Sequence, residues 1–477
     1  MFAFSFLSIL LNTYFGNNNY YYNGFILLIL GAAFVGIFVG IYCLILKAEH
    51  KLNKYFNIIA ALSFAVLFSL QVYFANKLRF TPAWDLEAVF SGATELLNKG
   101  TFTRYSSDTC HKDYFYIFPN NGGELFLLYT LFKIASVFKI TDFFMAASVF
   151  NSFICSFTMV ITACIVRHYF GAKGGIFAII LFLLSPPFWF MGAVFYSDTL
   201  SMIFPVLGYG IFLISEKTNV VYKKVILYCA VAVTLGIGML IKPTVLILLI
   251  GIVISLVLKA DFKKLALFVA TSAVFIGVIN LAFNAVTYRF LDKETLNEKK
   301  MPVSYWLAVG ANDDGYYNNN ILAEGLNEAD PVQRNKKLLQ TAKSGYKNKG
   351  VTGVIKHFAK KSSIAFGDGT YALSSFLDDG PVKQSSLHSF LLYGRENYKI
   401  YSHISTGIFL AIQTLMLFGI FKRRNINSII PLFCIFGLML FLLFWEISPR
   451  YIINFIPMIF ISASFGVCNV DCIYKTR

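Results

Sequence analysis

The chain has 477 residues, of which 57% are hydrophobic, 17% are aromatic and only 14% are charged. This composition excludes a water-soluble globular protein, because a core of this length cannot bury so much apolar surface. The formal net charge of +16 does not indicate nucleic-acid binding, since the basic residues cluster at the ends of apolar runs and not on one face. We therefore predict an all-α polytopic membrane protein.

Continuous apolar runs recur along the chain and predict its membrane spans. A bilayer-spanning helix needs roughly 18–20 apolar residues, and continuous runs predict helices, whereas barrel strands would alternate. About eleven runs qualify, within a range of about 10–13. They cover residues 24–46, 56–75, 143–166, 175–194, 199–214, 225–241, 244–258, 265–287, 404–421, 428–446 and 451–470.

Clusters of lysine and arginine indicate the orientation of the chain. The clusters lie at the ends of the apolar runs, on one side of the predicted membrane. If every cluster is cytoplasmic, the runs alternate in direction and the N-terminus lies outside. This alternation requires residues 122–138 to lie in the interface instead of crossing, which their shortness and Lys133 within them favour. Residues 1–16 are apolar but lack the basic region of a signal peptide. The clusters are Lys47, Lys51 and Lys54; Arg167 and Lys173; Lys217, Lys223 and Lys224; Lys259, Lys263 and Lys264; and Lys422, Arg423 and Arg424.

This topology divides the chain into five parts. Residues 76–142 and 288–403 form two long non-cytoplasmic loops, the first with an acidic motif and interfacial helices, the second a small cap domain with short helices. N-terminal transmembrane helices occupy residues 1–75, a transmembrane core residues 143–287, and C-terminal transmembrane helices residues 404–477. The eight cysteines form neither a disulfide framework nor a CxxC metal signature.

The first outer loop opens with an acidic motif. Thr81 suits an N-cap and Pro82 the first position of a helix that ends at Gly100. In such a helix Asp85 and Glu87 lie about 200° apart, so both face one substrate only if the first turn is unwound. Asp85, held ionised by the helix dipole, suits a proton acceptor or a metal ligand; the alternative is a first-turn acid that only stabilises the helix.

An aromatic stretch broken by a proline, residues 114–124, follows in the same loop. Tyr116 and Asn120 are candidate substrate-binding residues, because aromatic rings stack against sugars or polyprenyl headgroups. Aromatic residues at the headgroup level are also expected simply as belt residues.

The tight outer turns carry the remaining candidates. Tyr196 precedes Asp198, an acid in an apolar hairpin, which is either a functional residue or the N-cap of the next helix. Lys242 and Arg450 either reach toward lipid phosphates or clamp the phosphate of a bound substrate. Glu446, close to Arg450, favours the clamp and is a candidate substrate-binding residue.

The same acids are the candidate ligands of a metal ion. Asp85, Glu87 and Asp198 suit one divalent cation such as Mg or Mn through oxygen ligands, and no histidine or cysteine cluster supports a tighter site. Whether the protein requires a metal is left open, and no other cofactor is indicated.

Together these residues resemble the GT-C superfamily of membrane glycosyltransferases, in the branch of protein O-mannosyltransferases and the lipid A aminoarabinose transferase (family 39-like). The resemblance rests on Asp85 with Glu87, on residues 116–121, on residues 196–198 and on Arg450 with Tyr451. Most of it lies in roughly the first 260 residues, and each motif is only two or three residues long. An additional N-terminal span departs from the usual layout.

The resemblance implies that Asp85 is the catalytic carboxylate, that Asp198 assists, and that Arg450 and Lys242 hold the donor phosphate. The expected reaction is inverting transfer of a hexose or pentose from a polyprenyl-phosphate carrier to a hydroxyl of a lipid, cell-surface glycan or protein. The expected location is the non-cytoplasmic face of a plasma membrane in the cell envelope. Abundant asparagine, lysine, tyrosine and phenylalanine hint at an AT-rich genome and therefore favour a bacterial membrane.

Two other classes of function stay open on the sequence. A transporter or lipid flippase would place polar residues at mid-membrane, whereas here the charges gather at the ends of the apolar runs. A ligase or polymerase of surface polymers also uses a large outer loop, and it would differ in using a diphosphate-linked donor.

Overall fold

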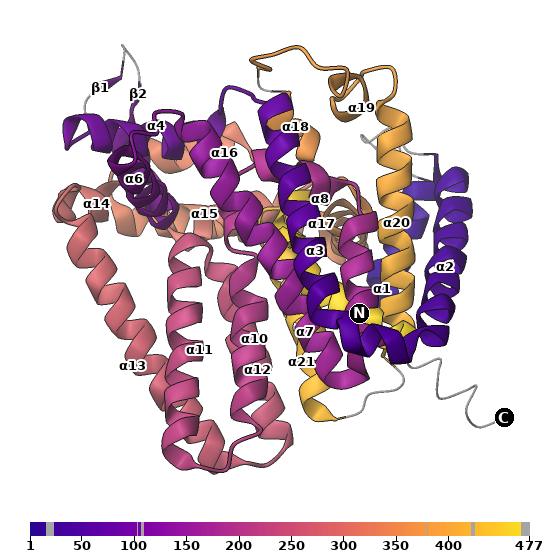
Figure 1. Ribbon diagram of the computed structural model, residues 1–477. Coiled ribbons are helices and arrows are strands. Elements are labelled where there is room, and N and C mark those ends of the chain that lie inside the picture. The colour runs from indigo at the N-terminus through magenta and orange to yellow at the C-terminus, as the bar shows by residue number, and fades with distance from the viewer. Residues whose placement is uncertain (16–22, 103, 106–108, 379, 421–424, 469–477) are drawn as a thin grey trace.

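The computed structural model describes residues 1–15, 23–102, 104–105, 109–378, 380–420 and 425–468 (Figure 1). In this part of the chain the fold is helical apart from one short hairpin, in which β1 (Arg104–Tyr105) pairs antiparallel with β2 (Thr109–Cys110). The predicted all-α membrane architecture is therefore confirmed.

The membrane-spanning part is a bundle of long apolar helices. Nine helical segments of the described residues are long and apolar enough to cross a membrane, and Phe2–Leu11 and Pro243–Leu258 are shorter apolar segments. The nine are α2 (Gly24–Lys47), α3 (Glu49–Lys77), α7 (Phe143–Leu184), α9 with α10 (Ser197–Leu200 and Ile203–Ser215), α11 (Val221–Ile241), α13 (Phe262–Thr287), α20 (Tyr398–Phe418), η4 with α21 (Ile426–Ile429 and Ile430–Phe444) and η5 with α22 (Pro449–Phe455 and Ile456–Cys468). The shorter segments belong to α1 (Phe2–Phe15) and to η3 with α12 (Pro243–Leu246 and Ile247–Leu258).

The long helix α7 is a hairpin of two predicted spans. Gly171, inside it, has φ 71° and ψ −169°, a left-handed conformation that glycine adopts easily. An added Cβ on Gly175 would lie 2.8 Å from the carbonyl oxygen of Ala163, although twelve residues of straight helix span about 18 Å. The chain therefore doubles back at Gly171. The predicted run 175–194 is not one continuous helix. It breaks after Leu184 at Pro186 and Pro187, and the short helices α8 (Pro187–Phe190) and η2 (Met191–Ala193) follow.

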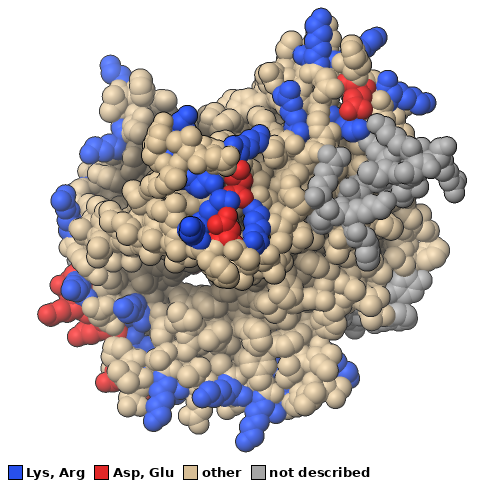
Figure 2. Space-filling view, turned by 90° about the horizontal axis from the view of Figure 1, so that it is seen from below, with Lys and Arg blue, Asp and Glu red and all other residues tan. Residues whose placement is uncertain are grey.

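The basic clusters lie at the other end of the bundle from the outer segments. Lys173 contacts Glu49 at 3.3 Å, and Lys259 forms an ion pair with Glu216, so that clusters from neighbouring hairpins meet. Figure 2, seen from below, shows lysine and arginine side chains scattered over this face and outnumbering the acids. The cluster at residues 422–424 lies outside the described residues.

The first outer segment consists of α4 (Trp84–Lys99), the β1–β2 hairpin, α5 (His111–Ile117), η1 (Pro119–Asn121) and α6 (Gly122–Val137). The predicted N-cap at Thr81 is wrong, since the N-cap is Ala83. Thr81 instead donates its backbone N–H to the Gly380 carbonyl at 3.0 Å, and this tertiary contact keeps the chain extended. The helix ends before Gly100, as predicted. Among the described helices α6 does not qualify as a span, and its place in the interface stays a prediction.

The second outer segment contains α14 (Lys293–Lys299), α15 (Val303–Ala311), α16 (Asn319–Leu326), α17 (Pro331–Gly367), α18 (Leu373–Leu377) and α19 (His388–Leu391). A small core of its own includes Tyr305 and Leu338. α17 folds back at Gly350, where φ is 60°, so that the rings of Tyr346 and His357 lie 6.2 Å apart. Its second leg packs against α1 and α21, which ties this segment to the membrane helices.

Candidate functional site

A cavity of about 1060 Å³ opens where one end of the helix bundle meets the outer segments. Its wall is built from the first turn of α4, from η1, α9 and α15, and from the turns that follow α11 and α21. All predicted site residues except Tyr116 line it, namely Asp85, Glu87, Asn120, Tyr196, Asp198, Lys242, Glu446 and Arg450. The structure therefore brings together residues that lie up to several hundred positions apart in the sequence.

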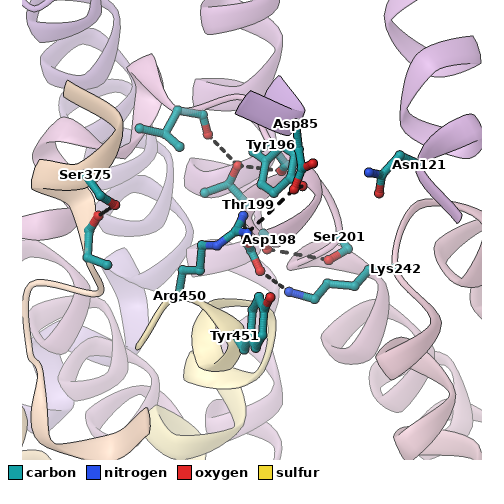
Figure 3. A network of polar contacts seen from close by, with 12 residues as sticks. Asp85, Asn121, Tyr196, Asp198, Thr199, Ser201, Lys242, Ser375, Arg450 and Tyr451 are labelled. Atoms are coloured by element: carbon teal, nitrogen blue, oxygen red, sulfur yellow. Dashed lines mark hydrogen bonds and ion pairs between the residues drawn. The ribbon is translucent and has the colours of Figure 1, made fainter. Parts of the chain in front are cut away.

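Two cations and two carboxylates form a chain of contacts in this cavity. Lys242 contacts one carboxylate oxygen of Asp198, and the Arg450 guanidinium lies 3.3 Å from the other. Arg450 also lies 4.0 Å from the Asp85 carboxylate. In Figure 3 the two cationic side chains approach Asp198 from opposite sides. Only 2% of the Asp198 side chain is exposed, against 44% for Asp85, so Asp85 is the carboxylate open to the cavity.

Asp85 is held from both sides by phenol groups. The hydroxyl of Tyr114 donates to Oδ1 at 2.7 Å, and the hydroxyl of Tyr196 donates to Oδ2 at 3.1 Å. Asn121 Nδ2 in turn donates to the Tyr114 oxygen at 2.5 Å. Burial, assisted by the charge of Asp85, raises the pKa of both phenols, so they stay protonated donors. This arrangement fixes the orientation of the Asp85 side chain in the cavity.

Tyr114 was missed in the sequence, and Tyr116 was predicted in its place. Both lie on α5, and two helical residues differ in direction by about 200°. The Tyr116 side chain is 5% exposed, and its hydroxyl accepts the Asp292 backbone N–H at 2.9 Å, so its role is structural. Only the rotation of α5, which the sequence does not reveal, distinguishes the two tyrosines.

The first turn of α4 differs from the prediction. Trp84 has φ 56°, which turns the chain sharply from the extended segment into the helix. The turn is not unwound, since the Glu87 backbone N–H donates to the Ala83 carbonyl at 3.1 Å. Asp85 and Glu87 nevertheless both line the cavity, because the cavity extends over more than one side of the first turn of α4.

Asp198 and the two cations also have clearer roles than the sequence indicated. The N-cap of α9 is Tyr196, so the N-cap interpretation of Asp198 is wrong. The side chains of Lys242 and Arg450 are only 12% and 19% exposed, and both are directed at Asp198 instead of lipid. Arg450 lies 4.8 Å from the ring of Tyr196, and Lys242 lies 5.1 Å from the ring of Tyr451.

A buried lysine, Lys361, holds the turn after α21 through hydrogen bonds. In the sequence it is one of several lysines in the second outer loop and does not stand out. Lys361, with no exposed surface, donates to the carbonyls of Trp445 at 2.5 Å and Gly310 at 2.8 Å. Burial lowers the pKa of this ammonium group to about 7. Glu446, which follows Trp445 in the chain, accepts a hydrogen bond from the Tyr451 hydroxyl at 2.7 Å. Burial raises the pKa of the Glu446 carboxyl group.

Part of the cavity wall consists of stacked aromatic rings. Trp306 on α15 stacks on Trp445 with ring centroids 5.4 Å apart and planes 6° apart. Trp445 stacks in turn on Phe441 of α21 at 4.8 Å. All three residues line the cavity, so the aromatic wall continues from the polar site onto a membrane helix. Such a surface suits an apolar chain or the face of a sugar ring.

The predicted metal ligands are not brought together as a metal site. Among the residues that the structure describes, no group of three or more histidine, cysteine, aspartate or glutamate side chains is placed to hold a metal ion. Asp198 is engaged by two cations, and Arg450 lies between it and Asp85. Asp198, one of the three predicted ligands, is therefore not available to a metal ion.

The fold and cavity define a multi-pass integral membrane protein with a charged pocket at one end of its helices. The chain belongs to a family described as conserved hypothetical integral membrane protein, whose model matches residues 1–470. A comparison with curated proteins finds no match.

Two solved structures show a distant likeness. One is the archaeal oligosaccharyltransferase AglB from Archaeoglobus fulgidus, in complex with an inhibitory peptide and a dolichol-phosphate, with a TM-score of 0.45 and 12% identity over 87% of this chain. This chain spans half the length of that one. The other is ArnT from Cupriavidus metallidurans bound to undecaprenyl phosphate, with a TM-score of 0.37 and 12% identity over 87% of this chain and 78% of that chain.

Proposed function

We propose that the protein is a membrane glycosyltransferase that moves a sugar from a polyprenyl-phosphate carrier to a hydroxyl acceptor. The observation that carries this proposal is a half-exposed carboxylate, Asp85, held by two phenols in a cavity that also contains Arg450 and Lys242. A general base and a cationic phosphate site in one pocket are the two elements that this reaction needs. The resemblance of the sequence motifs to GT-C glycosyltransferases points to the same reaction.

In the proposed mechanism Asp85 accepts the proton of the acceptor hydroxyl. The acceptor oxygen forms a bond to the anomeric carbon while the bond from that carbon to the phosphate oxygen breaks. The polyprenyl phosphate leaves with both bonding electrons and therefore gains one negative charge. Arg450 and Lys242 would neutralise this charge, so a separate general acid is not needed.

The contacts of the two cations leave room for a phosphate. A guanidinium group has five N–H donors and an ammonium group three, and only part of them is directed at Asp198. Asp198 holds both side chains in the cavity, because a carboxylate that is 2% exposed cannot exchange its partners for water. Asp198 is therefore assigned to positioning the cations.

A single displacement inverts the anomeric carbon. A retaining reaction would need a second carboxylate as nucleophile, close to the base and free to attack. Asp198 is buried and paired with two cations, which makes it a poor nucleophile. The geometry around Asp85 therefore favours inversion.

We further propose that the cavity faces the non-cytoplasmic side. The basic clusters lie at the opposite end of the bundle, and the positive-inside rule assigns that end to the cytoplasm. In this proposal the sugar transfer occurs at the outer leaflet, where the carrier would meet a surface acceptor.

Transport is the less favoured function. Four of the cavity's charged residues lie at the ends of candidate spans: Lys242 follows α11, Glu446 follows α21, and Asp198 and Arg450 are each the second residue of a span. The other two, Asp85 and Glu87, lie on α4 in the first outer segment. A translocation pathway would instead be expected to carry polar groups near mid-membrane.

The decisive test is the transfer of labelled sugars from short-chain polyprenyl-monophosphate donors by the purified protein. Wild type is compared with Asp85→Asn and Arg450→Ala, and with Glu95→Gln as a matched control. Glu95 is a buried acid on the same helix as Asp85, paired with Lys99 at 3.4 Å.

The proposal expects transfer by wild type and by the control, and a loss of about 100-fold or more in the two site variants. Normal turnover by Asp85→Asn would refute its role as the base. Transfer only from diphosphate-linked donors would support the ligase or polymerase function, and no transfer across a panel of sugars and acceptors would refute the glycosyltransferase proposal.

A further inference from the structure

A third carboxyl group, Glu124, lies behind the cavity wall. It is the third residue of α6, has no exposed surface, and does not line the cavity. Neither of its side-chain oxygens has a hydrogen-bond partner in the part of the chain that the structure describes. Burying a charged carboxylate without hydrogen-bond partners costs free energy, so the uncharged acid is favoured at this position.

The packing of α6 fixes where Glu124 lies. An added Cβ on Gly123 would come 1.8 Å from the Leu240 carbonyl oxygen, so the backbone of α6 rests directly on the last turn of α11. The residue that follows this turn is Lys242. Glycine at position 123 thus permits the contact that brings Glu124 next to the cationic part of the site.

The groups around Glu124 are those of the candidate active site. The charges of Asp85 on α4, Lys242 after α11 and Arg450 on η5 all act on its carboxyl group. The Ser197 backbone N–H also lies near it, but outside hydrogen-bond geometry. Burial, the largest cause, and the charge of Asp85 raise its pKa well above the usual range, although the two cations oppose this shift. This shift is toward the acid form, which the absence of hydrogen-bond partners for the two oxygens among the described residues also favours.

We propose that Glu124 is a positioning residue that stays uncharged so that the cationic pair beside it can hold the phosphate of the donor. Asp85 and Asp198 already match the charges of Arg450 and Lys242. An ionised Glu124 would add a further negative charge beside these two ion-paired carboxylates and would repel an anion. This inference rests on the proposed function for its ligand.

The pH dependence of binding tests this role. The probe is a short-chain polyprenyl monophosphate, whose affinity is measured between about pH 7 and pH 10 for wild type, Glu124→Gln and the control Glu95→Gln. Glutamine has the shape of the neutral acid and cannot ionise. We expect similar affinities at pH 7, and a loss toward pH 10 that is roughly tenfold larger in wild type and the control than in Glu124→Gln.

A loss of tenfold or more at pH 7 in Glu124→Gln would overturn the proposal, because it would show that the ionised form is needed. Identical pH profiles for all three proteins would also overturn it. Thermal unfolding of each variant in detergent shows whether the protein is folded, so that a packing defect is not mistaken for a binding defect.

A second measurement is independent of any ligand. The infrared difference spectrum between wild type and Glu124→Gln should contain the C=O stretch of a protonated carboxyl group at pH 7. Its absence would refute the uncharged state. If no protein binds the probe at any pH, the donor-phosphate role falls together with the proposed function, while the infrared band still decides whether Glu124 is protonated.

Discussion

Replacing Asp198 by asparagine should destabilise the protein strongly. The side chain is 2% exposed and lies between Lys242 and Arg450, so Asp198→Asn leaves two buried cations facing each other without their shared carboxylate. Removing one partner of a buried ion pair costs about 3–5 kcal/mol, because the remaining charge stays buried. For a chain of this length that unfolds as one unit, this corresponds to a fall in Tm of about 3–5 °C.

The assay is thermal unfolding of the purified protein in detergent, with the double variant Asp198→Asn/Lys242→Met as its partner. The double variant removes one of the two uncompensated cations and should recover at least about half of the loss. A fall below about 0.5 kcal/mol in Asp198→Asn, or a double variant that is less stable than the single one, would refute the reasoning that the three groups form a charged cluster.

Three further predictions concern packing, a buried charge and the bridging cation. Gly123→Ala should lower Tm or expression sharply, because its Cβ would overlap the Leu240 carbonyl, whereas Gly36→Ala, which meets nothing within 4 Å, should be neutral. Lys361 has a folded-state pKa of about 7, below that of the unfolded chain, so the unfolded chain binds more protons between about pH 7 and pH 10. Wild-type Tm should therefore rise over this range, and the rise should be smaller in Lys361→Met. Arg450→Lys should reduce kcat/KM for sugar transfer by about 10–100-fold, since an ammonium group cannot span two carboxylates; an unchanged value would contradict the bridging role.

The charged residues of the site could be predicted because membranes make charges conspicuous. Asp198, Lys242 and Arg450 stand at the ends of apolar runs, where charged residues are rare and therefore easy to recognise as candidates. The membrane spans followed from hydropathy for the same reason. The reversal at Gly171 is also visible in the sequence, because basic and glycine residues separate the two apolar runs that form α7.

The remaining parts of the site depend on contacts that no local pattern contains. Tyr114 and not Tyr116 reaches Asp85 because of how α5 is rotated on α4. Glu124 becomes a buried neighbour of Lys242 only through the close approach of α6 to α11. Thr81 does not cap α4, because its backbone N–H is bonded to the carbonyl of Gly380, which is distant in the sequence.

The contact between the N-terminal helix and the second outer segment has a consequence for biosynthesis. α1 packs against the second leg of α17, which ends at Gly367. At 5–20 residues per second, α1 therefore leaves the ribosome on the order of 20–70 s before this partner is complete. During that interval α2 can already pack on α1, but the face of α1 that contacts α17 is left to lipid or insertion factors. Completion of the outer segment is thus expected to be a late step, and defects in early insertion and in cap assembly should be coupled.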